Sequence, residues 1–467
     1  MTFSTETYTH RRHVLMSAVG NGLILLMGNG EAPMNYGANT YRFRQDSTFL
    51  YYLGIDRAGL AALLDCETGA VTIFGDELEM DDIVWTGPQP TIAAQAAKAG
   101  VGNTAPFASL SDRLAEARNA GKPVHFLPPY RGENSILLQK WLYVKPSEAR
   151  EKASEALIRA VVAQRSIKSE EEIAEIHKAC TTTSRMHRRA MEFARPGMIE
   201  AEVAAQARAI ALAADGDLSF PIICSVNGQT LHNHHHHNKI EEGRLLLVDT
   251  GAEAPSCYAG DMTRTFPTGS TFTQKQREIY QIVLDSQLSA IDMLAPGVAY
   301  KDVHLKAASV IANGLTDLGL MQGDPEQAVA SGAHALFFPH GLGHMMGLDV
   351  HDMEDLGENY VGYDAQVQRS DQFGTAYLRL GRALQPGFVL TVEPGIYFIP
   401  ELIDMWRSEG KFAQFLNFDI INEYRDFGGI RIEDDYVITS SGARLLGEPA
   451  PKTVEDVETV RTAALGR

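Results

Sequence analysis

Two aspartates lie at the end of an apolar segment, where their spacing could support metal or acid–base chemistry. Asp249 follows the apolar run Leu245–Val248, and Asp261 lies twelve residues further along. The midpoint falls at Pro255, so residues 252–257 predict a hairpin turn with the two carboxylates facing each other across paired strands. Either aspartate alone is more simply explained as a solvated turn residue. The apolar run before Asp249, however, favours a position near a hydrophobic core.

Two glutamates extend this set of acidic residues. Glu393 ends one apolar segment just before a Pro-Gly pair, and Glu433 lies in the segment 429–435. Strand-type alternation along that segment places Arg431 and Glu433 on one face and the isoleucines on the other. An unpaired carboxylate in apolar surroundings is costly, so neither glutamate is expected to be idle.

Carboxylates that share one site repel each other unless a proton or a cation lies between them. Convergence of the two aspartates and two glutamates would gather about four negative charges, which two divalent cations would neutralise. Structural zinc sites are dominated by cysteine and histidine. Four oxygen-donor residues with one imidazole instead suit manganese, cobalt, iron or zinc in a two-metal site.

Three histidines that could supply this imidazole lie in one glycine-containing segment: His340, His344 and His351. The first two are four residues apart, like the ligands of a zincin helix. Two glycines between them disfavour a helix, and Gly341 occupies the position of the zincin glutamate. The pattern therefore favours a glycine-lined segment that brings histidines to a cleft. Turn histidines without a role remain the alternative.

The composition excludes several classes of partner. The chain has 467 residues and a formal net charge of -18, so it lacks the basic footprint of a nucleic-acid-binding surface. An anionic membrane would repel the same surface, and no run reaches the roughly 18–20 apolar residues that span a bilayer. The four cysteines form no Cys-x-x-Cys pair, which indicates reduced thiols and a cytoplasmic protein.

The first part of the chain alternates strand and helix patterns. Its apolar stretch 14–27 could be a signal sequence, but Gly20-Asn21-Gly22 interrupts it, so a short helix followed by a strand is favoured. Strands are predicted at 22–27, 48–53, 60–64, 70–74 and 125–127, and a helix at 112–120 with Ser111 as its cap. This order indicates an α/β domain, and the helical, charge-rich stretch 146–165 predicts a connector.

A capping-box sequence from Ser169 to Glu172 begins a second region, in which two helices followed by strands occur twice. The first set is predicted at 170–194, 199–214, 219–226 and 244–250, and the second at 274–294, 301–318, 388–398 and 429–438. This repeated order predicts a duplicated α+β domain, although the halves share no convincing sequence identity. The long stretches 353–386 and 400–427 are expected to be functional elaborations between core strands.

These residues and their contexts resemble the pita-bread dinuclear metallopeptidases, most closely the Xaa-Pro aminopeptidases (aminopeptidase P), with the prolidases next. The segment 43–54, F-R-Q-D-S-T-F-L-Y-Y-L-G, resembles the amino-terminal domain of aminopeptidase P. The segments that resemble its catalytic domain are 244–266, 339–352, 391–398 and 428–439. The resemblance implies an α/β domain with a connector helix over residues 1–165. It also implies an α+β pita-bread catalytic domain with duplicated halves over residues 166–467.

The resemblance also implies a set of metal ligands in the expected chain order. These are Asp249, Asp261, His344, Glu393 and Glu433. They would hold two divalent metal ions, with manganese favoured over cobalt, zinc or iron, and Asp261 and Glu433 would bridge them. A hydroxide between the two metals would be the nucleophile, and Glu393 would act as its general base.

Further residues receive roles from the same resemblance. His340 is expected to contact the substrate near the scissile bond, and His351 to assist the tetrahedral intermediate and proton transfer. Tyr397 is expected to contact the substrate, and Arg431 to pair with ligand carboxylates. His232 lies 17 residues before Asp249, which is the family spacing for a catalytic, substrate-contacting histidine.

His232 belongs to the segment Leu231–Asn238, which contains five of the chain's 15 histidines. The internal position of this tract disfavours a purification tag. His234–His237 have no counterpart in the family, so we interpret them as a solvated loop beside the cleft. An auxiliary metal-binding or pH-sensitive role is the alternative.

The implied activity is metal-dependent hydrolysis of the peptide bond between an N-terminal residue and a following proline. The expected partners are peptides with proline at the second position and further copies of the chain, as a homodimer or homotetramer. A prolidase that cleaves only Xaa-Pro dipeptides is the alternative. A non-catalytic pita-bread binding module and a metal-independent, creatinase-like hydrolase are disfavoured, because no ligand position is lost.

Overall fold

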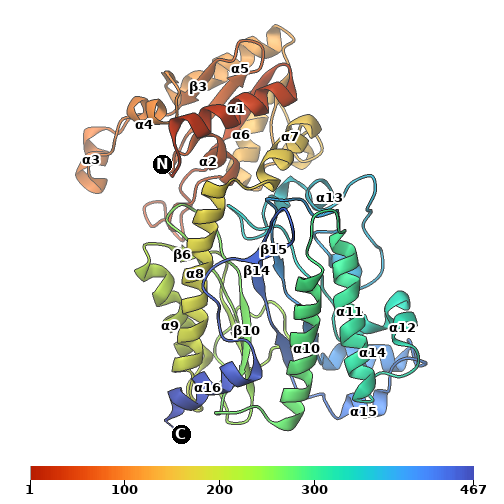
Figure 1. The fold of residues 1–467 in the computed structure, drawn as a ribbon. Helices are drawn as coiled ribbons and strands as arrows, with labels where there is room; N and C mark the ends of the chain where they lie inside the picture. Colours follow the sequence, from red (N-terminus) through yellow and green to blue (C-terminus); the bar gives the residue numbers. More distant parts are fainter. Residues whose placement is uncertain (1, 467) are drawn as a thin grey trace. The chain divides into compact units, whose positions relative to one another are not determined.

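The computed structural model describes residues 2–466 (Figure 1). The chain forms two compact units. One comprises the residues up to Arg165 together with Met353–Tyr360, and the other comprises Ser166–Asp352 and the residues from Val361 onward. The short segment Met353–Tyr360 therefore belongs to the first unit although it lies far along the chain.

The first unit is built on a five-stranded mixed sheet in the order β4-β3-β2-β1-β5. Its strands are β1 (Leu23–Met27), β2 (Ala61–Asp65), β3 (Val71–Phe74), β4 (Asn103–Ala105) and β5 (Val124–His125). Its helices are α1 (Thr5–Val19), α2 (Ser47–Leu53), α3 (Met80–Thr86), α4 (Ile92–Lys98), α5 (Leu110–Asn119), α6 (Gly132–Leu142) and α7 (Glu155–Ser166). Leu25 and Leu63 of the sheet pack with Leu114 and Trp141 of the helices, which confirms an α/β unit.

The strand predicted at residues 48–53 is wrong, because this segment forms helix α2. The carboxylate of Asp46 accepts a hydrogen bond from the Phe49 amide at 2.8 Å and caps the helix, and Gly54 ends it with φ 63°. All seven residues of α2 are buried. The aromatic and β-branched composition that indicated a strand therefore reflects burial on every side.

Two other boundaries differ from the predictions. Helix α5 begins at Leu110, not after Ser111, because the 3-10 turn η1 (Phe107–Ser109) leads directly into it and no side chain caps it. The predicted connector helix is interrupted: the 3-10 turn η2 (Pro146–Glu148) and α7 are separate elements. By contrast, α1 followed by β1 confirms the helix and strand expected at the amino terminus.

The second unit repeats the order of two helices followed by antiparallel strands, as predicted. Its first half contains α8 (Glu170–Phe193), α9 (Glu200–Ala213), β6 (Asp217–Leu218), β7 (Ile223–Ser225), β8 (Leu245–Asp249), β9 (Ala252–Glu253) and β10 (Thr263–Pro267). Its second half contains α10 (Gln274–Asp292), α11 (Tyr300–Asp317), β11 (Val389–Val392), β12 (Gly395–Tyr397), β13 (Gly429–Arg431), β14 (Asp434–Ile438) and β15 (Ala443–Leu445). In Figure 1, α8 and α9 of the first half lie on the left, and α10 and α11 of the second half lie on the right. Strands β10 and β14 lie between the two helix pairs.

Helix α8 begins as the sequence predicts. The hydroxyl of Ser169 accepts a hydrogen bond from the Glu172 amide at 3.3 Å, and the Glu172 carboxylate accepts one from the Ser169 amide at 3.1 Å. These reciprocal bonds form a capping box, which satisfies two of the amide groups that a helix start leaves unpaired.

Each half of the second unit contributes one three-stranded sheet, with strand orders β10-β8-β7 and β11-β14-β15. Of the strand predicted at 219–226, only β7 forms. Strand β6 ends at Leu218, before this range, and Pro221 lacks the amide that a continuous ladder needs. The strands predicted at 388–398 and 429–438 are divided. Their breaks fall at Glu393–Pro394 and at Ile432–Glu433, next to the acidic residues of interest.

The two long stretches between the core strands contain only short helices in the described structure. They hold η4 (Glu354–Leu356), α13 (Glu358–Val361), η5 (Thr375–Tyr377), α14 (Pro400–Ser408) and α15 (Phe418–Asn422). The remaining helices are α12 (Pro325–Ser331), η3 (Ala333–Leu336) and α16 (Val454–Leu465). None of the helices within residues 2–466 combines the length and apolar character needed to cross a membrane.

Candidate metal centre

The hairpin that carries Asp249 and Asp261 has a different register from the one predicted. Asp249 pairs with Thr263, not with Asp261. The loop of three residues before Tyr258 is closed by a hydrogen bond from the Ala254 amide to the Tyr258 carbonyl at 2.9 Å, and Cys257 adopts φ 67°. This left-handed residue shifts the pairing by one position on each strand. Because side chains two residues apart share a face, Asp261 still lies on the same side of the hairpin as Asp249.

Glu393 and Glu433 lie opposite each other at the breaks in their strands. Val392 pairs with Asp434 on one side of the break, and Gly395 pairs with Arg431 on the other. The same register runs through both pairs, so the two glutamates face each other where strand pairing is interrupted. The Glu433 carboxylate accepts a hydrogen bond from the Thr263 hydroxyl at 2.7 Å, which joins it to the aspartate hairpin.

The segment 340–344 is not helical in the described structure, which agrees with the rejection of a zincin helix. A side chain at Gly343 would lie 2.2 Å from the Thr391 carbonyl oxygen, so only glycine permits this close approach to β11. His344 then bonds β11 through its own backbone: its amide donates to the Thr391 hydroxyl, and its carbonyl accepts from the Thr391 amide, both at 3.1 Å. The glycine therefore fixes the position of His344.

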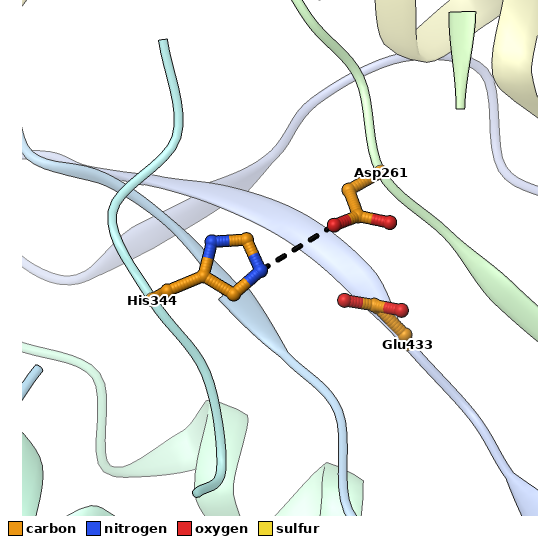
Figure 2. Close-up of side chains that lie close together, drawn as sticks. All are labelled: Asp261, His344 and Glu433. Carbon is orange, nitrogen blue, oxygen red and sulfur yellow. Dashed lines mark ion pairs between the residues drawn. The ribbon is translucent and has the colours of Figure 1, made fainter. Parts of the chain in front are cut away.

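The side chains of Asp261, His344 and Glu433 point toward one another (Figure 2). One potential ligand atom from each residue lies within 4.8 Å of the other two. His344 Nε2 is 3.4 Å from Asp261 Oδ2 and 3.7 Å from Glu393 Oε1. Asp261 Oδ1 is buried and has no hydrogen-bond partner among residues 2–466. A buried carboxylate oxygen without a partner, beside further carboxylates and an imidazole, fits a divalent cation.

The pKa shifts of these carboxyl groups also favour a bound cation. Burial raises the pKa of Asp261 and that of Glu433 well above their ordinary values, and the charges of neighbouring carboxylates raise both further. Burial also raises the pKa of Glu393, to about 7, although His344 and Arg431 oppose this shift. The fold thus gathers acidic groups whose joint ionisation needs a positive charge among them.

A hydrogen-bonded chain links Asp249 to His340. Arg431 donates from Nη2 to the Asp249 carboxylate and from Nη1 to the Tyr397 hydroxyl at 2.8 Å. The Tyr397 hydroxyl lies 2.9 Å from His340 Nε2. Burial and the nearby charge of Arg431 lower the pKa of His340 to about 3, so this imidazole is neutral at physiological pH. Arg431 also donates from Nε to the Thr263 hydroxyl that bonds Glu433, so both side chains lie on one face as predicted.

The other two histidines given roles by the sequence lie in different surroundings. The ring of His351 packs edge-on against that of His344, with centroids 4.2 Å apart. His232 is exposed in a turn. Its pKa is lowered by partial desolvation and then by the charge of Arg431, whereas the charge of Asp249 raises it. His232 is therefore within electrostatic range of the acidic cluster.

The remaining histidines of the tract lie further toward solvent. His234, His235 and His237 are exposed, and His236 is half-buried with Nε2 3.0 Å from the Ile222 carbonyl oxygen. The tract ends where the buried carboxylate of Glu200 accepts hydrogen bonds from Asn238. None of these four histidines belongs to the acidic cluster that the structure describes.

Sequence reasoning missed several residues that shape this site. Thr263 connects Glu433 with Arg431, and the Tyr300 hydroxyl donates to the Thr391 carbonyl at 2.6 Å behind Glu393. The charge of Arg379 contributes to lowering the pKa of both His232 and His340. Isolated hydroxyl and guanidinium groups outside motifs give no signal in one sequence. Asp435 could have been found, since it follows Glu433 in an apolar strand.

Comparison with known proteins agrees with this geometry. Residues 174–440 match the model of metallopeptidase family M24, and residues 8–125 match the amino-terminal domain of aminopeptidase P. The chain belongs to metallopeptidase family M24. This membership confirms the resemblance, the mixed α/β pita-bread fold and the enzyme class expected from the sequence, so the chain is a metal-dependent hydrolase.

The relatives of this M24 metallopeptidase include both kinds of proline-directed enzyme. Human Xaa-Pro dipeptidase is 32% identical over 94% of this chain and 89% of its own length. A protein of Fusarium vanettenii described as a probable Xaa-Pro aminopeptidase is 32% identical over 94% of this chain and 92% of its own. The structure of Escherichia coli aminopeptidase P with the inhibitor Pro-Leu aligns with a TM-score of 0.82, 29% identity and complete coverage of both chains.

Proposed function

We propose that this M24 metallopeptidase removes the N-terminal residue from peptides whose second residue is proline. The observation that carries the proposal is the buried cluster of Asp261, His344 and Glu433, with Glu393 3.7 Å from His344. The likeness to Escherichia coli aminopeptidase P over the whole chain supports the aminopeptidase specificity. The substrates are accordingly Xaa-Pro-containing peptides.

Five residues would hold two divalent cations in this proposal. They are Asp249, Asp261, His344, Glu393 and Glu433. The hard carboxylate oxygens and the single imidazole favour manganese, with cobalt, zinc or iron as alternatives. When bound, such cations supply Lewis acidity, which polarises the scissile carbonyl and lowers the pKa of water in the site.

The side chains of this protein supply the remaining chemistry. Glu393 is the proposed general base, because its carboxylate lies beside the other candidate ligands, with Oε1 3.7 Å from His344 Nε2. His340 is neutral, and its two ring nitrogens lie within hydrogen-bond distance of the Gly341 carbonyl and the Tyr397 hydroxyl, so it would present an uncharged ring to the substrate. Arg431 orients Tyr397 and the Asp249 carboxylate. His232 and His351 are proposed to contact the substrate and assist proton transfer.

Three features beyond the activity are also proposals. The domains are residues 1–165, with the connector, and residues 166–467. The protein is cytoplasmic, as its free cysteines suggest. It assembles as a homodimer or homotetramer, as the family resemblance implies.

A prolidase that cleaves only dipeptides is the second candidate, because human Xaa-Pro dipeptidase is 32% identical over nearly the whole chain. The two activities are distinguished by comparing an Xaa-Pro dipeptide with an Xaa-Pro-Xaa tripeptide that shares its first residue. We expect the tripeptide to be hydrolysed with the higher kcat/KM. Turnover of the dipeptide alone would establish the prolidase.

The metal requirement is tested on the same substrates. Protein treated with a chelator and then dialysed should be inactive, and addition of Mn²⁺ or Co²⁺ should restore turnover. Peptides with alanine in place of proline are the matched substrate control. Full activity of the chelated protein, verified as metal-free by elemental analysis, would reject the proposed function.

A further inference from the structure

A fifth acidic residue, Asp435, contacts the backbone of one candidate ligand. Asp435 is fully buried and follows Glu433 by two positions in the same chain segment. Its Oδ2 accepts two hydrogen bonds at 3.0 Å, one from the Asp261 amide and one from the Cys180 thiol. Its Oδ1 has no hydrogen-bond partner among the described residues. The bonding of this carboxylate therefore converges on one oxygen that faces the Asp261 backbone.

These contacts connect the two candidate bridging ligands. Asp435 belongs to β14, where it pairs with Thr391, so its backbone is fixed within the sheet of the second half. Asp261 belongs to the hairpin of the first half. The hydrogen bond from the Asp261 amide to the Asp435 carboxylate therefore joins the two halves. It lies at the backbone of one candidate ligand, Asp261, and two residues from the other, Glu433.

Helix α8 contacts both Asp435 and the aspartate hairpin. Cys180, Thr183 and His187 are spaced by three and four residues, so they share one helix face, and all three are fully buried. The Thr183 hydroxyl accepts from the Ala252 amide at 2.9 Å, and His187 Nε2 lies 3.1 Å from the Thr250 carbonyl oxygen. Polar groups of this helix face therefore bond the part of the aspartate hairpin that precedes its turn, and the Cys180 thiol bonds Asp435.

The fit between helix and hairpin is close at Gly260. A side chain at this position would lie 2.7 Å from the Thr183 hydroxyl and 2.9 Å from the backbone nitrogen of Cys180. The residue before Asp261 is therefore in direct contact with α8. A change in the Asp435–Cys180 pair consequently acts on the Asp261 backbone at short range.

We propose that Asp435, supported by Cys180, is a positioning residue that sets the separation of Asp261 and Glu433 and thereby the affinity of the site for divalent cations. The inference rests on the proposed function, because it takes Asp261 and Glu433 as cation ligands. Residues that hydrogen-bond metal ligands without contacting the metal typically contribute about 10- to 100-fold to metal affinity. A residue that only stabilised the fold would leave that affinity unchanged.

The test compares Asp435→Ala with Asp435→Asn in the full-length, metal-stripped protein. Mn²⁺ binding is measured by isothermal titration calorimetry, and thermal unfolding is followed without and with saturating Mn²⁺. We expect Asp435→Ala to raise the Kd for Mn²⁺ by about 10- to 100-fold. Asp435→Asn should change it by less than about threefold, because the amide oxygen can accept the same two hydrogen bonds.

A second pair of variants decides the matter if Asp435→Ala does not fold. Cys180→Ala removes one donor to Asp435, and we expect it to raise the Kd by about three- to tenfold. Cys224→Ala is the matched control, because Cys224 is also fully buried in the same unit but its thiol bonds the Glu200 carbonyl and not Asp435. This control should leave the Kd unchanged.

The outcomes separate this inference from the proposed function. Wild-type protein that binds no Mn²⁺ would overturn both. Normal wild-type binding, with unchanged Kd values in Asp435→Ala and Cys180→Ala, would overturn only the positioning role, even if their unfolding temperatures fell. Equal losses of affinity in Asp435→Ala and Asp435→Asn would also overturn it, since the accepted hydrogen bonds would then not be the cause.

Discussion

The chain has two histidine-rich segments whose surroundings are opposite. Residues 232–237 include five histidines, and four of them are exposed in the loop before β8. The segment 340–351 includes only three, yet His344 is buried and lies 3.4 Å from the Asp261 carboxylate. The first segment attracts attention in the sequence, whereas the second lies at the acidic cluster.

The difference between the segments comes from their neighbours. The carboxylates of Asp261, Glu393 and Glu433 lie near the His344 ring, and Gly343 lets the backbone of His344 bond β11. The rings of His235 and His237 are exposed and lie with their centroids 6.0 Å apart. An imidazole becomes a cation ligand only where fixed geometry and negative charge meet. The density of histidines in a sequence reports neither property.

The strongest test of this contrast replaces one histidine of each segment with alanine. His344→Ala should lower kcat/KM by about 1,000-fold or more, because it removes a ligand atom from the cluster. His236→Ala is the matched control, since this imidazole also has a polar contact, with the Ile222 carbonyl. Its kcat/KM should stay within about threefold of wild type. Steady-state assays at saturating Mn²⁺ measure both, and comparable losses would remove the distinction between the segments.

The rigidity of the second segment can be tested at a buried ion pair. Lys168 Nζ lies 2.7 Å from Asp352 Oδ2, next to His351, and both side chains are about 1% exposed. Lys168→Met should reduce the free energy of unfolding by about 3–5 kcal/mol, because it removes the buried cation that neutralises the Asp352 carboxylate. The double variant Lys168→Met/Asp352→Asn should recover part of this loss.

An exposed ion pair is the control for that experiment. Arg185 and Glu448 are 3.0 Å apart on the surface, so Arg185→Met should change the free energy of unfolding by less than about 1 kcal/mol. Urea unfolding of each variant supplies the comparison. If Lys168→Met proved as mild as the surface variant, the buried pair would not be what holds the histidine segment.

The pH dependence of cation binding probes the acidic surroundings of His344. Raised pKa values mean that Asp261, Glu393 and Glu433 keep protons in the metal-free fold at pH values where the unfolded chain has lost them. Their contribution to stability is full below about pH 4 and is lost as pH rises through about 7 for Glu393. Cations must displace these protons.

The Kd for Mn²⁺ should therefore rise by about tenfold or more for each pH unit below 7. Calorimetric titrations at pH 6, 7 and 8 measure the dependence. Glu393→Gln, which cannot be protonated in this range, should show a shallower slope. A Kd independent of pH would contradict the raised pKa values.

The smallest effect on kcat/KM is expected from the histidine tract His234–His237. Replacing His234, His235, His236 and His237 together with serine should change kcat/KM by less than about threefold, since none of them reaches the cluster. His232→Ala is the contrasting variant and should cost about 100-fold through lost acid–base assistance. A large loss in the serine variant with little loss in His232→Ala would show that the wrong histidine was chosen.

Much of the catalytic unit could be predicted because its signals are local. The Ser169–Glu172 capping box, the repeated order of helices and strands, and the acidic residues within apolar segments each depend on a few neighbouring residues. The strand predicted at residues 48–53 failed for the opposite reason. Its composition fits both a strand and a helix buried on every side, and only packing decides between them.

The residue types that could form the site, and their order along the chain, can be read from the sequence alone. Their alignment in space was decided by tertiary structure. The left-handed Cys257 moved Asp249 opposite Thr263, and the breaks at Glu393 and Glu433 brought two glutamates face to face. Strand register and burial depend on contacts between distant segments, such as the bond from Asp261 to Asp435. No local pattern encodes these contacts, because each depends on how the rest of the chain packs.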